Sequence, residues 1–504
     1  MENYNLAEEL EKHHKPTIAE GNQFDSSEVL RALHGNEDGD ARLFNEIHKD
    51  NFIYDHAAGQ WYEWAGHYWR LDEKNEVTEA VQDVIKNYAQ EAQRQSWKRL
   101  KAIKSSDKEA AAKHQKNEDA LFKRIKELQR VRRKKDILYL ATVGRGLSGH
   151  EWDNGPMLLG CKNGIIDLAT GKHRPGKPSD HIKTVAPTEW QGIDAPCDNW
   201  TRFLSEIFAG DAELIKYVQR LLGYGITGKT SDHVHPIFWG KGRNGKTTMF
   251  EALRHVLGLL AYKADSEILL KQRFARQAGA PDASLMALQG KRLVYASESD
   301  EGRNLNASKL KELCGGDTLT GRAPYGRRQV EFTPSHLLLL LTNHKPHAPA
   351  RDYALWARIH LIPFNMSFIE NPSAENERKA DPDLLEKLKG QASGILAWLV
   401  RGCLDWQKQG LNPPDTVTAA TKEYQRDEDI MGHFIDVCCI IGDRKEIKAG
   451  QLYSAYKDWA NEAGHRPVSL TKFGRDIRER HDSYKNRSGV HYIGIGLLAE
   501  SVNT

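Results

Sequence analysis

The sequence predicts an α/β fold with a central parallel sheet in the middle of the chain. Five consecutive leucines at 337–341 are typical of a strand that is buried on both faces, as in a parallel sheet covered by helices. Residues 236–258 read as an apolar strand, a glycine-rich loop and an amphipathic helix, in that order. A chain of 504 residues has room for about three domains, so we expect further modules around this core.

We divide the chain into five predicted segments. They are a flexible leader at 1–40, an N-terminal α+β region with basic helices at 41–205, a core with its preceding helices at 206–371, a helical connector at 372–430 and a winged-helix-like domain at 431–504.

The composition is that of a globular protein, with 39% hydrophobic and 28% charged residues. No apolar run approaches the roughly 20 residues that a membrane helix needs, and the first twenty residues are too polar and acidic for a secretory signal. The six cysteines show no C-x-x-C spacing, which argues against a disulfide framework and a zinc ribbon. We therefore expect a protein of the reducing cytoplasm.

Charge is unevenly distributed along the chain. The net charge is +3, but residues 91–135 hold sixteen Lys or Arg and six Asp or Glu, a net +10. Such a segment could contact a polyanion. It could equally be the solvated face of ordinary helices. The sequence favours the second reading, because Trp97 and Phe122 are the only aromatic residues in the segment.

The first half of the chain alternates between predicted strands and helices. The polar leader lacks periodicity, and we read Asp38-Gly39-Asp40 within it as a turn. Residues 41–70 are rich in Trp and Tyr around Gly59 and Gly66, which favours short strands and tight turns. Residues 79–140 predict long helices.

Strands return at 156–175, where Asn163-Gly164 and Thr170-Gly171 are turn signals. Helical periodicity then resumes over 199–222.

Residues 240–247 match the P-loop, or Walker A, pattern G-x-x-x-x-G-K-[ST] between a strand and a helix. Glycines let backbone N–H groups turn toward phosphates at the positive end of a helix. Lys246 adds a mobile positive charge, and Thr247 offers a hydroxyl to Mg²⁺. The pattern predicts a nucleoside triphosphatase site. The residues expected to contact the triphosphate are Gly240, Gly242, Asn244, Gly245, Lys246, Thr247 and Thr248.

Two further polar residues follow predicted strands. Glu298 comes after the apolar run 293–296, where it could lie near Mg²⁺ and activate the attacking water. Asp300 is the weaker choice, because it also fits the start of a surface turn. Asn343 follows the leucine strand, where its amide could contact the γ-phosphate or the attacking water. Its alternative is a turn residue ahead of Pro346.

A hairpin is predicted between these two strands. Residues 318–323 can pair with 329–332 around a turn at 324–327. Its tip would present Arg322, Tyr325, Arg327 and Arg328. Cations that follow phosphates and a ring that stacks on a base suit single-stranded nucleic acid, although an ordinary surface hairpin has the same pattern.

The C-terminal segment predicts helix, helix and wing. A polar connector at 372–388 leads into helices that extend to Tyr424, and residues 450–464 are amphipathic. A second helix at 469–480 exposes Lys472, Arg475, Arg478 and Arg480. A hairpin turning at 487–489 would bring Lys485 or Arg487 near phosphates. Winged helices also bind proteins, so the sequence does not decide whether this domain binds DNA or a protein.

The order of these motifs resembles the superfamily 3 DNA helicases. The branch is that of the phage and plasmid replicative primase-helicases, which includes the poxvirus primase-helicase. The likeness is carried by GKGRNGKTT, GKRLVYASESDEGRNLNASKLKELCGGDTLTGRAPYG, FTPSHLLLLLTNHKP and ALWARIHLIPF, and upstream by NGIIDLATGKHRP and FAGDAELIKYVQRLLGYGITG. It implies an AAA+-like core whose P-loop binds ATP and Mg²⁺ through Lys246, Thr247 and Glu298, with Asn343 as the polar sensor.

The resemblance also implies a ring. Arg358 matches the arginine that reaches the γ-phosphate of the neighbouring subunit, and Lys311 falls where the family has a lysine. The implied state is a hexamer whose hairpins move with the ATP state along a single strand or fork. A separate primase or polymerase is an implied partner, and the cytoplasm of a bacterial host is the implied location. Many relatives carry an upstream primase domain, but this sequence shows no carboxylate pattern for one.

The leading hypothesis is therefore an ATP-driven ring helicase that acts in the replication of a phage or mobile element. The alternative is an initiator protein, in which ATP controls assembly on origin DNA with little processive unwinding. A P-loop kinase of small molecules is a third hypothesis, against which the charged hairpin argues.

Overall fold

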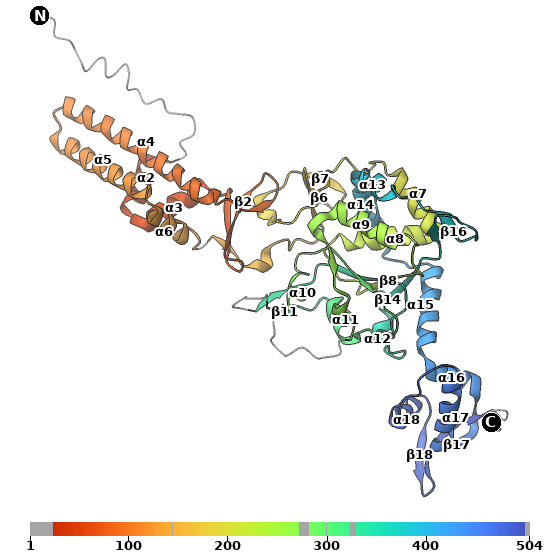
Figure 1. Cartoon of the computed structure of the whole chain (residues 1–504). Coiled ribbons are helices and arrows are strands. Elements are labelled where there is room, and N and C mark those ends of the chain that lie inside the picture. The colour runs from red at the N-terminus through yellow and green to blue at the C-terminus, as the bar shows by residue number, and fades with distance from the viewer. Residues whose placement is uncertain (1–23, 144, 272–281, 299, 323–328, 499–504) are drawn as a thin grey trace, which may run out of the picture. The chain divides into compact units, whose positions relative to one another are not determined.

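The computed structural model describes residues 24–143, 145–271, 282–298, 300–322 and 329–498. The chain divides into two compact units (Figure 1). The first comprises the described residues up to 167 together with 172–186, and the second comprises 168–171 and the residues from 187 onward. Each unit has its own hydrophobic core. Within the described residues, no helix is both long and apolar enough to cross a membrane.

The second unit is built around a five-stranded parallel sheet. All six residues of the leucine strand are buried, which confirms the prediction of a strand covered on both faces. The strand order is β14 (Ile359–Pro363), β8 (His235–Trp239), β13 (Leu337–Thr342), β10 (Leu293–Glu298) and β9 (Ala261–Ala264).

The register of this sheet aligns the carboxyl ends of four strands. Glu298 pairs with Thr342, Thr342 pairs with Trp239, and Trp239 pairs with Pro363. These four residues are the last of β10, β13, β8 and β14. The loops that follow the strands therefore meet at one edge of the sheet, where open α/β sheets bind their ligands.

The predicted strand, loop and helix at 236–258 are confirmed, and α9 ends at Leu257 with Gly258 as its C-cap. The other elements of the sheet region are α7 (Asp198–Ile207), α8 (Ala212–Gly225), α9 (Lys246–Leu257), α10 (Ala283–Met286), α11 (Ala307–Leu313), β11 (Leu319–Gly321), β12 (Val330–Phe332), α12 (Tyr353–Trp356), β15 (Ser367–Ile369), β16 (Glu377–Lys379), α13 (Leu384–Lys389), α14 (Ala392–Gln409) and α15 (Asp415–Glu428).

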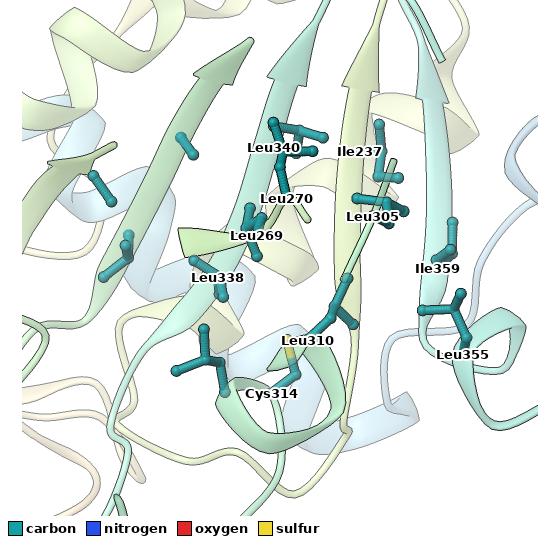
Figure 2. Packing of buried hydrophobic residues seen from close by; sticks show 14 of the residues in the cluster. Ile237, Leu269, Leu270, Leu305, Leu310, Cys314, Leu338, Leu340, Leu355 and Ile359 are labelled. Atoms are coloured by element: carbon teal, nitrogen blue, oxygen red, sulfur yellow. The ribbon is translucent and has the colours of Figure 1, made fainter. Parts of the chain in front are cut away.

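One face of the sheet packs against short helices (Figure 2). Ile237, Leu338 and Leu340 lie in a buried cluster with Leu310 of α11 and Leu355 of α12. Full burial of one such side chain contributes roughly 1.5–3 kcal/mol. This cluster therefore fixes the strands whose carboxyl ends hold the polar loops.

Helices α8 and α14 approach each other through glycines. A Cβ added to Gly223 would lie 2.2 Å from the backbone nitrogen of Cys403, and one added to Gly402 would lie 2.0 Å from the carbonyl oxygen of Gln219. Any side chain at either position would push the two helices apart.

The C-terminal part of the second unit combines helices with a small sheet. Its elements are α16 (Ile430–Cys438), β17 (Cys439–Lys448), α17 (Ala449–Glu462), α18 (Leu470–Arg478), β18 (Ser483–Asn486) and β19 (Gly489–Leu497), with strand order β17-β19-β18. The two predicted helices and the hairpin are confirmed. The sequence predicted no element for β17, whose pairing with β19 shifts register between Ile441 and Glu446.

The first unit contains a helical part and two small sheets. Its helices are α2 (Ser26–His34), α3 (Asn36–Ile47), α4 (Glu76–Lys104), α5 (Lys108–Leu128) and α6 (Val131–Ala141). Its sheets have the orders β3-β2-β1-β4 and β5-β6-β7, with β1 (Phe52–Asp55), β2 (Gln60–Trp64), β3 (Trp69–Leu71), β4 (Gly146–Leu147), β5 (Leu158–Cys161), β6 (Gly164–Asp167) and β7 (Lys172–Arg174). The predicted long helices and the turn at Asn163-Gly164 are confirmed.

The prediction of a loose leader up to residue 40 is wrong from Ser26 onward. Helix α2 begins with a capping box in which Asp25 and Glu28 bond each other's backbone. The predicted turn at Asp38-Gly39-Asp40 is also wrong, because these residues lie within α3.

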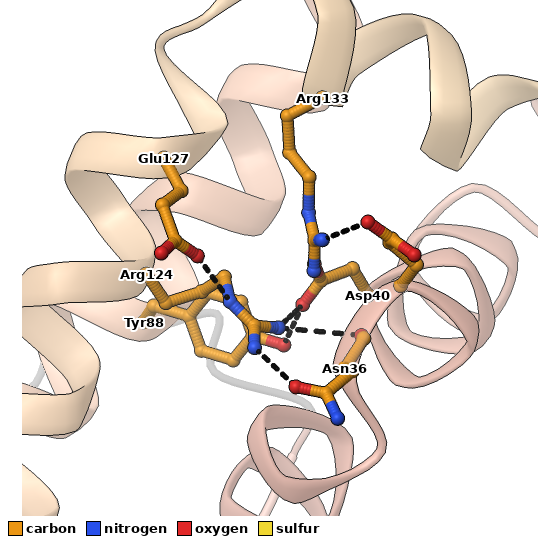
Figure 3. A network of polar contacts seen from close by, with 7 residues as sticks. Asn36, Asp40, Tyr88, Arg124, Glu127 and Arg133 are labelled. Carbon is orange, nitrogen blue, oxygen red and sulfur yellow. Dashed lines mark hydrogen bonds and ion pairs between the residues drawn. The ribbon is translucent and has the colours of Figure 1, made fainter.

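The turn prediction failed because Asp40 is a fully buried helical residue and not a surface turn residue (Figure 3). Its carboxylate accepts hydrogen bonds from Tyr88 Oη at 2.7 Å, Arg124 Nη1 at 2.7 Å and Arg133 Nη2 at 2.6 Å. These partners lie 48 to 93 positions further along the chain. A local sequence pattern cannot reveal contacts of that separation.

Candidate functional site

The loop between β8 and α9 forms a glycine-lined turn at the carboxyl edge of the sheet. Gly242 and Gly245 adopt φ values of +97° and +85°, which favour glycine. A Cβ added to Gly245 would lie 2.6 Å from Ile207 Cγ2 of α7, so this position also lacks room for a side chain. The amide of Gly240 donates to the carbonyl of Thr342 at 3.2 Å, which ties the loop to β13.

The N-terminus of α9 completes this loop. The helix begins at Lys246, so the amides of Lys246, Thr247 and Thr248 lie in its first turn, where a helix offers N–H groups without intrahelical acceptors. Asn244 is buried, and among the described residues its Nδ2 atom has no hydrogen-bond partner. Donors gathered in this way suit an anion.

Lys246 is a buried cation. Its Nζ donates to the carbonyl of Gly240 at 2.7 Å and lies 3.3 Å from Oδ1 of Asn343. Burial lowers the pKa of Lys246 to about 8. No carboxylate of the described residues pairs with it, so a bound polyanion would stabilise its charged form.

Glu298 is the buried acid at the same edge. Its Oε2 accepts a hydrogen bond from Ser266 Oγ at 3.0 Å, and its Oε1 accepts one from the amide of Asp300 at 2.8 Å. Both bonds fix the orientation of the carboxylate. Asp300, the weaker candidate for the acidic residue, is exposed. Ser266 follows β9, and sequence reasoning missed it because a lone serine after a strand carries no distinctive pattern.

Asn343 joins this group from β13. It follows the last residue of that strand and is half-buried, and its side chain contacts Lys246. The structure thus brings together Lys246, Asn343 and Glu298 at the ends of β8, β13 and β10. The roles that the sequence suggests for them stay predictions.

Arg358 lies at the other edge of the sheet. It precedes β14, and the first residue of that strand, Ile359, pairs with His235 at the amino end of β8. Five residues of strand, about 16 Å, separate it from the edge that carries Lys246. Its Nη1 donates to the carbonyl of Ala354 at 2.6 Å, and its buried Nε has no hydrogen-bond partner among the described residues.

Lys311 forms an intramolecular ion pair. Its Nζ lies 3.0 Å from Oδ2 of Asp352, the residue that caps α12. The side chain of Lys311 is one-third exposed, so its charge faces a carboxylate as well as solvent.

The predicted hairpin pairs as expected. Leu319 of β11 lies opposite Phe332 of β12, and Gly321 lies opposite Val330. Arg322 follows β11 and is half-buried. Tyr325, Arg327 and Arg328 lie outside the described residues.

Helix α18 presents three of its predicted cations to solvent. Lys472, Arg475 and Arg478 are exposed, while Phe473 and Ile477 are fully buried beneath them. The prediction that Arg480 is exposed is wrong. Arg480 makes an ion pair with Asp429, and its side chain is only 17% exposed. Lys485 and Arg487 of the hairpin are exposed.

A cavity of about 860 Å³ opens beside the loop. No sequence pattern predicted it, since its lining comes from three separate segments. Lys345 Nζ lies 4.9 Å from the centroid of the Trp239 ring and 3.1 Å from Oδ2 of Asp427. The lining residues are Trp239, Lys241, Glu301, Gly302, Asn343, His344, Lys345 and His347.

The residues fit the two groups that the P-loop pattern implies. Buried Lys246, the orphaned amide of Asn244 and the helix terminus match a triphosphate. No cluster of three or more potential metal ligands occurs among the described residues. Mg²⁺ at phosphate sites needs only one or two protein oxygens, because phosphate and water complete its shell. The hydroxyl of Thr247 and the carboxylate of Glu298 are suitable.

The chain is similar to viral proteins that are named putative helicases and putative primases. Residues 41–209 match the family described as D5 N terminal like, and residues 238–358 match a family of unknown function, DUF5906. The putative helicase L207/L206 of Acanthamoeba polyphaga mimivirus is 29% identical over 84% of this chain and 46% of that protein. The putative helicase 022R of Frog virus 3 is 24% identical over 58% of this chain and 31% of that protein.

The putative primase C962R of African swine fever virus (isolate Warthog) is 23% identical over 70% of this chain and 40% of that protein. The chain thus spans less than half the length of these relatives. Among solved structures, the C-terminal region (305-718) of NrS-1 matches 90% of this chain and 98% of its own, at 13% identity and a TM-score of 0.45.

Proposed function

Because the chain belongs to the primase-helicase family of phages and large DNA viruses, we propose that it is an ATP-dependent DNA helicase. It forms a ring that translocates on DNA and unwinds it during replication. Residues 206–371 are the P-loop core and residues 431–504 a winged helix. The convergence of Lys246, Glu298 and Asn343 at one sheet edge supports this most, since phosphoryl transfer needs a cation, an acid and a polar group there.

In this proposal the triphosphate lies on the amides of residues 240–248. Lys246 exchanges its contacts with Gly240 and Asn343 for phosphate oxygens, which restores its pKa toward the ordinary value of a lysine. When bound, Mg²⁺ neutralises charge on the phosphates. Thr247 and Glu298 hold it, and Glu298 also orients the attacking water through a carboxylate fixed by Ser266.

The position of Arg358 supports turnover between two copies of the chain. The length of β14 separates this arginine from the Lys246 of its own chain. Its guanidinium donates to the carbonyl of Ala354 and interacts with the carboxylate of Asp352, but no ion pair within 4 Å holds it among the described residues, so it is available to a neighbour's γ-phosphate. An arginine acting in trans can raise the turnover rate by 10³ or more. A site completed by a neighbour requires a closed ring or a filament.

DNA contact is assigned to the hairpin and to α18. The sequence that joins β11 to β12 carries Arg322, Tyr325, Arg327 and Arg328, and in this proposal these residues contact DNA. The exposed Lys472, Arg475 and Arg478 follow phosphates. Lys311 would contribute after releasing Asp352.

A complementation experiment tests the shared site. Lys246→Ala and Arg358→Ala should each abolish ATP turnover, and Arg254→Ala, an exposed arginine on α9, serves as the matched control. In randomly mixed rings of the two variants, about a quarter of the junctions pair an intact lysine with an intact arginine, so turnover should partly return. Full turnover by a dilute monomer, or no recovery in mixtures that still assemble, would refute the trans arrangement.

A strand-displacement assay on forked DNA tests unwinding itself. The intact chain should displace the strand with ATP, while Lys246→Ala should not. DNA-stimulated hydrolysis without displacement would instead identify an ATP-controlled initiator that binds origin DNA.

A further inference from the structure

Two acidic residues of the hairpin formed by α4 and α5, Glu91 and Glu118, are turned inward. Glu91 is fully buried and accepts hydrogen bonds from Ser26 and Gln95, and Glu118, 9% exposed, accepts one from Arg99 at 2.9 Å. Arg124 is likewise drawn inward by Asp40 (Figure 3). The net charge of +10 in residues 91–135 is therefore shown to solvent mostly by lysines.

These lysines lie on the outer faces of the two helices. In the part of the chain that the structure describes, none of them pairs with a carboxylate. They are Lys101, Lys108, Lys113, Lys116, Lys123 and Lys126.

The two aromatic residues of the segment are exposed among them. The exposed fractions are 48% for Trp97 and 55% for Phe122. Lys101, one turn after Trp97 on α4, holds its Nζ 5.5 Å from the centroid of the indole ring. The hairpin thus shows a flat π surface next to cations, the combination with which proteins hold unpaired bases and their phosphates.

Among the described residues, α2 packs against the near half of the hairpin, where Lys98 Nζ donates to Ser26 Oγ at 3.2 Å. The ends of α4 and α5 extend past α2 and α3 within this unit (Figure 1). Trp97 and Lys101 lie in the second half of α4 and are exposed among the described residues.

We propose that the outer face of the α4–α5 hairpin is a separate binding surface for single-stranded DNA. Phosphates lie along Lys101, Lys108, Lys113 and Lys116, and a base stacks on Trp97. A duplex would leave the indole unused, because its base faces are already stacked. The choice of DNA rests on the proposed function, but the surface needs neither ATP nor Lys246.

The experiment measures binding of a fluorescent oligothymidine to the full chain without nucleotide, over a series of KCl concentrations. Trp97→Ala should weaken binding roughly five- to hundredfold, the loss of one stacked base. Replacing the four lysines with alanine should reduce the slope of log Kd against log salt by about two to three. Tyr139→Ala, an aromatic residue 74% exposed on α6, is the matched control and should change neither quantity.

Photo-crosslinking assigns the contact when other DNA sites are present on the chain. An iodouracil-containing strand should crosslink to the peptide that contains Trp97, in the Lys246→Ala variant as well as in the intact chain. A crosslink in that variant would stand even if ATP-driven unwinding failed. Unchanged affinity and salt slope in the hairpin variants, no crosslink at Trp97, or equal binding of a blunt duplex would overturn the proposal.

Discussion

Single histidines make the stability of the second unit depend on pH. His235, His336 and His360 are buried in or beside the parallel sheet, and burial lowers the pKa of each from 6.5 to about 4. Between pH 6.5 and 4 these three histidines are therefore protonated in the unfolded chain and neutral in the folded chain. Stability is highest above pH 6.5 and falls as the pH drops, by about 1.4 kcal/mol per histidine per pH unit.

His336 offers the sharpest test of this dependence. Neither of its ring nitrogens has a hydrogen-bond partner among the described residues. We expect His336→Leu to lessen the loss of stability by about 1.4 kcal/mol per pH unit between pH 6.5 and 4. Stability at pH 7 should not fall, because two unpaired polar atoms leave the core. Urea unfolding at several pH values measures this; curves parallel to those of the intact chain would contradict it.

At the residue scale, the sequence predicted site residues that lie just after buried strands. Glu298 and Asn343 stand at the ends of apolar runs and Lys246 follows the apolar run at 236–239 across the glycine loop, so their shared edge followed from the parallel sheet. Ser266 could not be found this way, because its role depends on the side chain of Glu298 on a neighbouring strand. The partner of Lys311 was hidden for the same reason, since Asp352 lies 41 positions away.

At the element scale, the packing of α8 on α14 depends on glycine. Gly402→Ala would place a methyl group on the carbonyl of Gln219, so we expect a cost of roughly 1–3 kcal/mol despite the better helix propensity of alanine. Gly450→Ala on α17 is the matched control, because no atom lies within 4 Å of the point that an added Cβ would occupy. It should be neutral or stabilise by up to about 1 kcal/mol. Thermal melts compare the two; equal shifts would contradict the packing argument.

Elements with a clear period or turn signal were predictable, and those defined by distant contacts were not. The leucine strand β13 and the turn at Asn163-Gly164 carry local signals. Helix α3 does not, because its polar residue Asp40 is stabilised by arginines from α5 and α6. Strand β17 lacks a regular alternation, since its register shifts part-way along.

At the scale of the whole molecule, the division into two compact units, each with a large core of its own, predicts that the two units unfold in separate transitions. Asp40→Ala removes the buried carboxylate that Arg124 and Arg133 share and leaves them only Glu127 and Glu37, so it should destabilise the first unit by about 3 kcal/mol. Asp38→Ala, on the same helix, removes only an exposed pair with Arg42 and should cost less than about 1 kcal/mol. Scanning calorimetry of the full chain should show one transition moving in Asp40→Ala; a shift of both would mean that the units unfold together.

The path of the chain between the units limits how they can be separated. The chain enters the second unit first at Leu168–Gly171, returns to the first for 172–186, and enters the second again at Pro187. Residues 168–171 are held in the second unit by a hydrogen bond, in which Gln407 Nε2 donates to the carbonyl of Leu168 at 2.8 Å. A single cut or a single recombination point therefore cannot exchange either unit cleanly for that of a relative. Recombination between relatives must therefore transfer both units together, or the segment 168–171 must be replaced as well.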